Sequence, residues 1–224
     1  MTISNTPNWK KVMNNANEIL VKSKVITTFP FSPKKIVKEL SSIKCCTYAR
    51  AEEKYHVNIK AFGSESAVIM RENEQDQEIL FYNNQKPKTH IRFSILHELG
   101  HVVNGHSFAF ESEERAKVKE IETNFFAAQL LMPEQLIREF QRRGVTISKE
   151  FLMKTFVVSK EAAEKRLTTL RKINWNRRSF EEKQFDEGIV LKYSEFLDSI
   201  KPSTVNNIDW FEDEYDLEIQ RSAW

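Results

Sequence analysis

Cysteine is nearly absent from the sequence, since Cys45 and Cys46 are the only two among 224 residues. Because they are adjacent, they cannot connect distant parts of the fold through a disulfide bond, which fits a reducing compartment better than secretion. Long apolar runs are absent as well: no stretch reaches the roughly 18 residues of a membrane span, and no signal-peptide pattern opens the chain. We therefore expect a cytoplasmic protein that does not associate with a membrane.

Glycine and proline are also scarce, with 5 and 6 residues, whereas 40% of the residues are hydrophobic and 29% are charged. This composition is typical of a folded protein and excludes fibrous and disordered chains. The formal net charge of +2 gives no global field that would attract nucleic acid or an anionic membrane. A chain of this length can bury one ordinary core, so we expect one compact domain with a smaller appended unit.

The first part of the chain mixes helical and strand patterns. Apolar residues at helical spacing predict helices over residues 8–22 and 33–40, the second with a proline in its first turn. Between residues 45 and 83 the pattern changes to short segments rich in β-branched and aromatic residues, namely HVNIKAF, SAVIM and EILFYNN. These segments predict a small, mainly antiparallel sheet.

The second part is predicted to be helical, with helices over residues 89–104, 113–131 and 133–144. Gly105 is a natural left-handed stop for the first of them. Two further helices are expected after residue 148, with a break at Val158 and Ser159, and they resemble a helix-turn-helix. Beyond Asn174 the pattern is weak, and the final IDWFEDEYDLEIQRSAW indicates a peripheral tail with an aromatic anchor.

The stretch from Ser94 to His106, SILHELGHVVNGH, contains three of the five histidines. Within it, His97, Glu98 and His101 form the pattern H-E-x-x-H. Residues four apart share a helix face, so both imidazoles can reach one Zn²⁺ at roughly 2.0–2.1 Å while Glu98 can hold the metal's water. The pattern arises by chance in about one chain in a hundred of this composition. A third ligand is needed to decide between a metal site and a histidine-rich core helix.

His106 is the nearest candidate for that ligand, but its register excludes the metzincin pattern. That pattern requires a glycine three residues and a histidine six residues after the second ligand. Gly105 and His106 lie four and five residues after His101. We therefore interpret His106 as a helix-end or supporting residue, with metal contact as the weaker alternative. His90, seven residues before His97, is interpreted as structural.

A better third ligand lies on the following helix, KVKEIETNFFAAQLLMP. Glu120 and Asn124 are four apart and share a face, so Glu120 can bind the metal while Asn124 steadies a ligand histidine. Glu122 points elsewhere and is the reserve candidate. The small side chains of Ala127 and Ala128 would let this helix approach the histidine helix closely.

These residues carry a family resemblance. HELGH, preceded by THIRFSIL and followed by ExExNFFAAxLLMP, resembles the ImmA/IrrE family of gluzincin-type metallopeptidases over residues 81–133. The segment FVVSKEAAEKRL is more weakly similar to the helix-turn-helix-like region that follows the peptidase core in many members. Thr123 departs from the alanine that is typical there and leaves the predicted ligands intact.

The patterns and the resemblance together predict an α+β fold. It consists of a small zincin-like core, with a short, mainly antiparallel sheet and an HExxH helix, followed by a helix-turn-helix-like α-helical subdomain. Residues 1–132 are the expected zinc metallopeptidase domain, residues 133–173 the helical subdomain, and residues 174–224 a C-terminal extension of unknown role.

The predicted activity is that of a zinc-dependent endopeptidase. His97, His101 and Glu120 would hold one Zn²⁺, or another divalent metal, and Glu98 would act as general base and acid. The strand EILFYN is expected to present an edge for an extended substrate. Tyr82 is a candidate near the oxyanion, although an ordinary strand aromatic is the favoured interpretation. The resemblance implies that the substrate is a partner protein, a helix-turn-helix repressor of a phage, mobile element or stress regulon.

Two alternatives belong to other functional classes. A DNA-binding regulator is suggested by residues 160–178, which carry seven Lys or Arg against two Glu. The near-neutral charge of the whole chain makes direct DNA binding the weaker hypothesis. A protein-interaction module with structural zinc is the second alternative. Such a site normally has four protein ligands, and the sequence offers three beside the acid at position 98.

Overall fold

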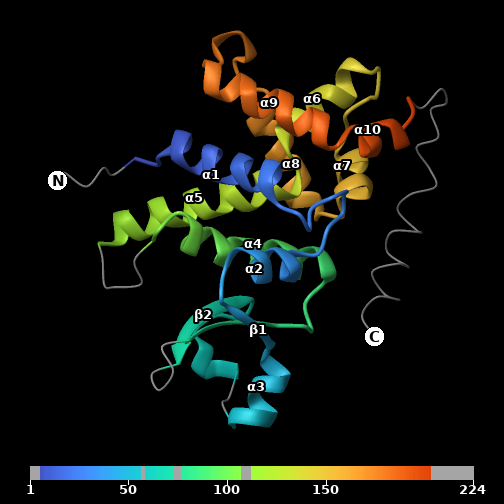
Figure 1. The fold of residues 1–224 in the computed structure, drawn as a ribbon. Helices are drawn as coiled ribbons and strands as arrows, with labels where there is room; N and C mark the ends of the chain where they lie inside the picture. The colour runs from blue at the N-terminus through green and yellow to red at the C-terminus, as the bar shows by residue number, and fades with distance from the viewer. Residues whose placement is uncertain (1–5, 57–58, 73–76, 107–111, 203–224) are drawn as a thin grey trace.

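The computed structural model describes residues 6–56, 59–72, 77–106 and 112–202, and it has an α+β fold (Figure 1). The acidic, aromatic C-terminal segment predicted to be a peripheral tail lies outside the described residues. The helices and strands follow in chain order: α1 Trp9–Lys22, α2 Pro33–Leu40, β1 Lys44–Thr47, α3 Tyr48–Tyr55, the 3₁₀ helix η1 Ile59–Phe62, β2 Ala67–Glu72, β3 Gln77–Tyr82, α4 Lys88–Val103, α5 Glu113–Leu131, α6 Glu134–Arg142, α7 Lys149–Phe156, α8 Lys160–Leu170, the 3₁₀ helix η2 Trp175–Arg177, α9 Phe180–Lys192 and α10 Ser194–Ser199.

The sheet has three strands in the order β1-β3-β2. β2 and β3 are antiparallel, with Ala67 opposite Tyr82, whereas β1 and β3 are parallel, with Lys44 opposite Ile79. The longer of the two pairs is antiparallel, as predicted. β3 contains residues 78–82 of the segment EILFYN and is paired on both sides, so the prediction that this segment presents an edge for a substrate is wrong. Within the described ranges, β1 and β2 are the two edges of the sheet.

Part of the predicted strand content is helical instead. Residues 48–55 form α3, which ends at His56 in a left-handed conformation with φ 54°, and the end of HVNIKAF forms η1. The sheet explains this difference, because Ile79 and Phe81 of β3 point away from the main core and need a cover. Tyr48 and Phe62 supply it with rings stacked 4.5 Å apart. A single-sequence strand pattern does not show that this second face must be covered.

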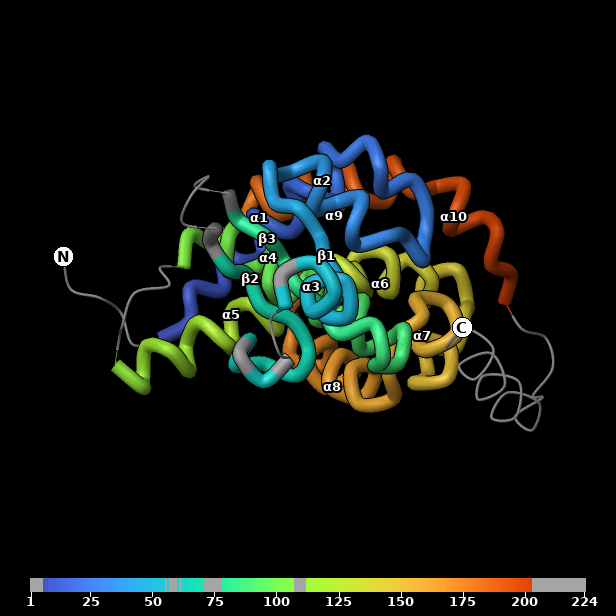
Figure 2. The backbone as a smooth tube through the Cα atoms, turned by 90° about the horizontal axis from the view of Figure 1, so that it is seen from below, coloured from blue at the N-terminus to red at the C-terminus, as the bar shows by residue number. Residues whose placement is uncertain are grey.

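Helix α4 lies between the sheet and α5, and α3 lies on the other side of the sheet (Figure 1). Helix α4 also packs on α2, and α1 packs on α5. Figure 2, seen from the sheet side, shows α3 in front of the strands. The predicted C-terminal stop of α4 is confirmed, since Gly105 has φ +67°. No described helix is both long and apolar enough to cross a membrane.

The close approach of α4 and α5 depends on Gly100. A methyl group added there would lie 3.0 Å from Cδ1 of Phe126 and 3.3 Å from Cγ2 of Thr123. The prediction named Ala127 and Ala128 as the small residues of this contact. Ala127 is buried there, but the glycine on the partner helix permits the approach. This spacing between the helices sets the geometry described below.

The helical half of the chain forms part of the same main core. Ser159 caps α8 by accepting from the Ala162 N–H, after a break that begins at Val157. Helices α9 and α10, from the region where the sequence pattern was weak, pack on α1 and α6, and the Tyr193 hydroxyl donates to the Leu20 carbonyl at 2.8 Å. The core therefore takes side chains from all three expected segments. Their division into domains stays a prediction.

The basic run 160–178 is partly directed inward. Arg166 is buried, donates from Nε to the Met132 carbonyl at 2.9 Å and also bonds Gln129. Arg178 forms ion pairs with Glu134 and, at 3.3 Å, with Asp186. Two of the seven basic side chains are thus engaged inside the protein and not available to phosphates.

Candidate metal centre

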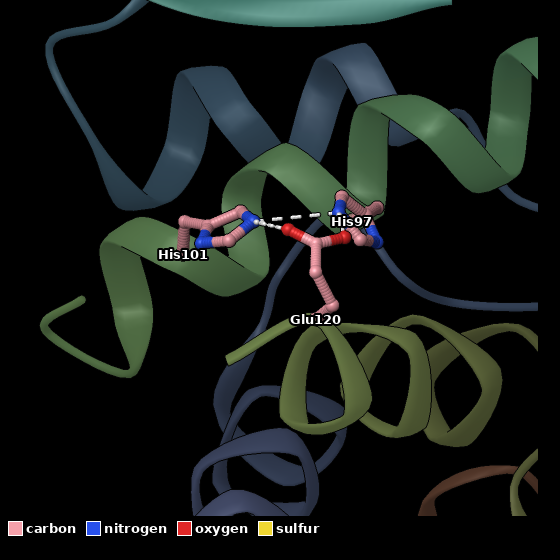
Figure 3. A group of neighbouring side chains, drawn as sticks. All are labelled: His97, His101 and Glu120. Carbon is pink, nitrogen blue, oxygen red and sulfur yellow. Dashed lines mark hydrogen bonds and ion pairs between the residues drawn. The ribbon is translucent and has the colours of Figure 1, made fainter. Parts of the chain in front are cut away.

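Helices α4 and α5 bring the three predicted ligands together. His97 and His101 lie one turn apart on the same face of α4, and Glu120 extends from α5 to a point between their rings (Figure 3). Ser112 begins α5 by accepting from the Arg115 N–H, which fixes where the helix starts and therefore the turn that carries Glu120. Among the described residues, these three are the group of His, Cys, Asp and Glu side chains that could hold a metal ion.

The donor atoms of the three side chains have the separations of a tetrahedral site. Nε2 of His97 lies 3.3 Å from Nε2 of His101, and the Glu120 carboxylate oxygens lie 3.2 and 3.4 Å from these two nitrogens. Ligands about 2.0–2.1 Å from a tetrahedral Zn²⁺ are separated by about 3.3–3.4 Å. Each Glu120 oxygen contacts one of the two nitrogens, and this set of two imidazoles and one carboxylate fits a zinc ion by its chemistry and spacing.

The electrostatics of the group favour a cation. Hydrogen bonds from His101 and His97 hold the pKa of the Glu120 carboxyl well below its usual range, so this carboxylate is ionised. Burial lowers the pKa of His97, but its hydrogen bond with Glu120 and the charges of Glu120 and Glu98 outweigh burial and raise it.

His97 is held from behind by Asn124. The Asn124 Oδ1 lies 3.0 Å from Nδ1 of His97, so Nδ1–H can donate to it and leave Nε2 free for a metal. Thr123 is a further neighbour that the sequence did not reveal, because its hydroxyl lies 3.4 Å from Nε2 of His97 and also donates to the Lys119 carbonyl. The substitution of threonine for alanine at this position therefore touches the site.

His101 is held by His106 and Glu122. Nδ1 of His106 lies 3.2 Å from Nδ1 of His101, and its Nε2 lies 2.9 Å from Glu122 Oε2. Glu122 Oε1 accepts from the Asn8 N–H at 2.6 Å. If Nε2 of His101 binds a metal, the His101 Nδ1–H donates to Nδ1 of His106, and the His106 Nε2–H donates to Glu122. Glu122, the reserve ligand, is thus buried and oriented away from the group.

Glu98 lies next to the two histidines and is half-buried. Burial raises the pKa of its carboxyl, and the positive potential of His97 and His101 lowers it less. Oε2 of Glu98 accepts from the Ile69 N–H of β2 at 3.2 Å, which fixes the carboxylate beside the edge of the sheet. A raised pKa suits a group that takes up and returns a proton near neutral pH.

The family model for the IrrE N-terminal-like domain, a peptidase family, matches residues 51–168, more than half of the chain. The chain belongs to the IrrE N-terminal-like domain family. A search of curated protein sequences gave no match. Among solved structures, a Mycobacterium tuberculosis transcriptional regulator is similar, with a TM-score of 0.47 and 14% identity over 76% of this chain. The present chain spans about half of that protein, 49% of its length.

The match to the IrrE N-terminal-like domain includes α4 and α5 in full, and with them the whole histidine and glutamate group. It ends inside α8, so α9 and α10 lie outside it. Membership of this peptidase family implies a divalent metal in the chemistry of the domain. It does not identify that metal or a substrate.

Two weaker candidates lie elsewhere in this IrrE N-terminal-like domain. The hydroxyl of Tyr82 is 3.4 Å from Nζ of Lys34, and the ring packs in the main core. Among the described residues no contact joins it to the metal group. His90 bonds the Ser66 hydroxyl at 2.8 Å, and burial lowers its pKa. Both positions agree with the structural interpretations favoured from sequence.

Proposed function

We propose that this chain is a zinc-dependent endopeptidase that hydrolyses a peptide bond in a partner protein. The observation that carries the proposal is the grouping of His97 Nε2, His101 Nε2 and the two Glu120 carboxylate oxygens, each oxygen 3.2–3.4 Å from one of the nitrogens, beside the half-buried carboxylate of Glu98. A structural zinc site normally has four protein ligands. Three ligands with an acid next to them are the arrangement of a catalytic site, in which the fourth position is left for water and substrate.

A bound Zn²⁺ would lower the pKa of water towards 7 and polarise the scissile carbonyl. The protein's own residues have the remaining tasks. Glu98 accepts the proton of the attacking water and delivers it to the leaving amine. Asn124 and the pair of His106 and Glu122 keep the ligand imidazoles in one tautomer and orientation.

The substrate is proposed to bind along β2. This strand forms one edge of the sheet and borders α4, and its Ile69 N–H contacts Glu98. An extended peptide that adds to this edge would gain backbone hydrogen bonds and place its scissile bond beside Glu98. β3, the strand expected from sequence to have this role, is excluded because both of its sides are paired.

The substrate class follows from the family resemblance and not from the site. It implies a helix-turn-helix transcriptional repressor of a phage, mobile element or stress regulon, and cleavage would release the genes that the repressor controls. The partner is therefore sought first in the neighbouring gene.

The test combines the zinc-loaded full chain with the purified neighbouring repressor, and fragments are identified by mass spectrometry. Glu98→Gln keeps the size of the side chain but removes the base, so we expect the cleavage rate to fall by roughly 10²–10⁴-fold while zinc binding persists. Glu114→Gln, at an exposed position on α5, is the matched control and should cleave like the wild type.

Cleavage that continues unchanged in Glu98→Gln would reject the proposed chemistry. A protein-interaction module with structural zinc would be favoured instead if Glu98→Gln retained full biological function while His97→Ala failed to fold. A salt-dependent shift of duplex DNA that survives removal of zinc would favour the DNA-binding alternative.

A further inference from the structure

A pocket of about 600 Å³ lies along β1, at the edge of the sheet opposite to β2. Five basic side chains line it: Lys34 and Lys38 from α2, Lys44 from β1, and Arg50 and Lys54 from α3. All five are exposed, and no acidic side chain of the described part of the chain joins them. We call this the basic pocket.

The cations flank β1 from both faces of the sheet. Helix α2 packs on the main core through Ile36 and Val37, whereas α3 covers the opposite face through Tyr48 and Ala51. The positive charges of the two helices therefore lie above and below the edge of β1. Within the described ranges, Lys38, Lys44 and Arg50 form no ion pair with an acidic residue. The like charges of these three side chains repel each other, and an anionic partner would relieve this repulsion.

The edge itself can accept a strand. β1 pairs with β3 on one side, and in the part of the chain that the structure describes no strand lies on its other side. An edge strand has outward-facing N–H and C=O groups, to which an extended peptide can bind. An acidic peptide in this position would satisfy both the backbone groups and the flanking cations.

The chain contains such a peptide. Residues 203–224 have six acidic residues and one arginine, so in a chain of net charge +2 they carry −5 and residues 1–202 carry +7. Residues 214–219, EYDLEI, alternate acidic and apolar side chains, which is the pattern of a half-buried strand. Glu212, Asp213 and Glu214 are consecutive, so in an extended strand they point alternately to the two faces from which the cations approach.

Residues 212–219 follow the described part of the chain after a short connection. The last described residue, Pro202, lies beside Gly144 at the end of α6. The ten residues from there to Glu212 can extend about 33 Å, at about 3.3 Å per residue. This span is about twice the radius of gyration of a folded domain of this size, which is about 17 Å.

We propose that residues 212–219, the tail segment, bind in the basic pocket of the same chain as a strand added to the free edge of β1. Its acidic side chains face the lysines and arginine of α2 and α3. Its backbone pairs with β1, and the apolar side chains of the alternating part pack along the aliphatic stems of the basic residues. The proposal is independent of any catalytic activity, because β1 lies on the far side of β3 from Glu98.

The chain supplies its own reporters for a test, since its two cysteines, Cys45 and Cys46, both line the basic pocket. Burial raises the pKa of both thiols, so alkylation of the full chain is followed at about pH 8.5 by mass spectrometry. We expect slow labelling in the wild type and labelling about tenfold faster in a variant whose tail acids are neutralised by Glu212→Gln, Asp213→Asn, Glu214→Gln, Asp216→Asn and Glu218→Gln.

The matched control neutralises five glutamates at exposed positions outside the tail, namely Glu18, Glu113, Glu114, Glu187 and Glu195, and should label like the wild type. A synthetic peptide of residues 208–219, added in excess, should restore slow labelling to the tail-neutralised variant, and a scrambled peptide of the same composition should not. Equal labelling of wild type and tail-neutralised variant would overturn the proposal. Cysteine labelling that becomes slower as the protein concentration rises would also overturn the proposal, because the tail would then bind another copy of the chain.

Discussion

His106 offers the sharpest test of how the two histidines of the proposed metal site are supported. It is buried, with 7% of its surface exposed, and it lies between His101 and the equally buried Glu122. His106→Ala removes the acceptor of the His101 Nδ1–H and the donor to Glu122 Oε2. Among the described residues, the Asn8 N–H then remains as the donor to the Glu122 carboxylate.

Two effects of this substitution should be measurable. A buried polar group that loses its partner costs about 1–3 kcal/mol, which corresponds to a fall of about 3–10 °C in the melting temperature of a chain of this size. A lost partner behind a ligand histidine costs about 10–100-fold in metal affinity. The melting temperature is measured by thermal denaturation of the metal-free protein, and the metal affinity is measured by competitive zinc titration.

His90→Ala is the matched control, because His90 is exposed on the same helix and bonds the Ser66 hydroxyl. It should change the stability by no more than about 0.5 kcal/mol and leave zinc affinity as it is. If His106→Ala binds zinc as tightly as the wild type, His106 does not orient His101 and the reasoning is refuted.

Three further substitutions test other parts of the account. Asn124→Ala should lower zinc affinity about tenfold with little change in melting temperature, because the residue is exposed; unchanged affinity would contradict its role behind His97. Gly100→Ala places a methyl group 3.0 Å from Phe126, and overpacking of about 1–3 kcal/mol less about 1 kcal/mol of helix propensity leaves a net loss of stability near 1 kcal/mol; a stabilised variant would show that the helices can separate freely. Arg166→Ala should destabilise by about 3 kcal/mol in urea unfolding because its buried partners lose their donor, and equal stability of wild type and variant would contradict this.

The grouping of His97, His101 and Glu120 could be predicted from sequence because it depends on local periodicity. His97 and His101 are four apart on one helix, and Glu120 and Asn124 are four apart on the next, so each pair shares a face whatever the rest of the fold does. The contact between Glu122 and His106 could not be predicted in this way. It joins residues sixteen apart in the sequence, and helical spacing says nothing about such a pair.

The remaining differences have tertiary causes. The donors to Glu98 and Glu122 are the backbone N–H groups of Ile69 and Asn8, and a backbone donor leaves no mark in the side-chain sequence. The edge position of β2 depends on strand order, which β1 decides by pairing parallel to β3. Helix α9 has little amphipathic pattern and is recognised only through its packing on α1 and α6.

The central claim is that His97, His101 and Glu120 together bind one metal ion. The direct measurement is a crystal structure of the full chain loaded with one equivalent of zinc, with anomalous data collected at the zinc absorption edge. We predict one peak about 2.0–2.2 Å from Nε2 of His97, Nε2 of His101 and an oxygen of Glu120. A peak at other residues, or no peak between α4 and α5 at full zinc loading, would contradict the account.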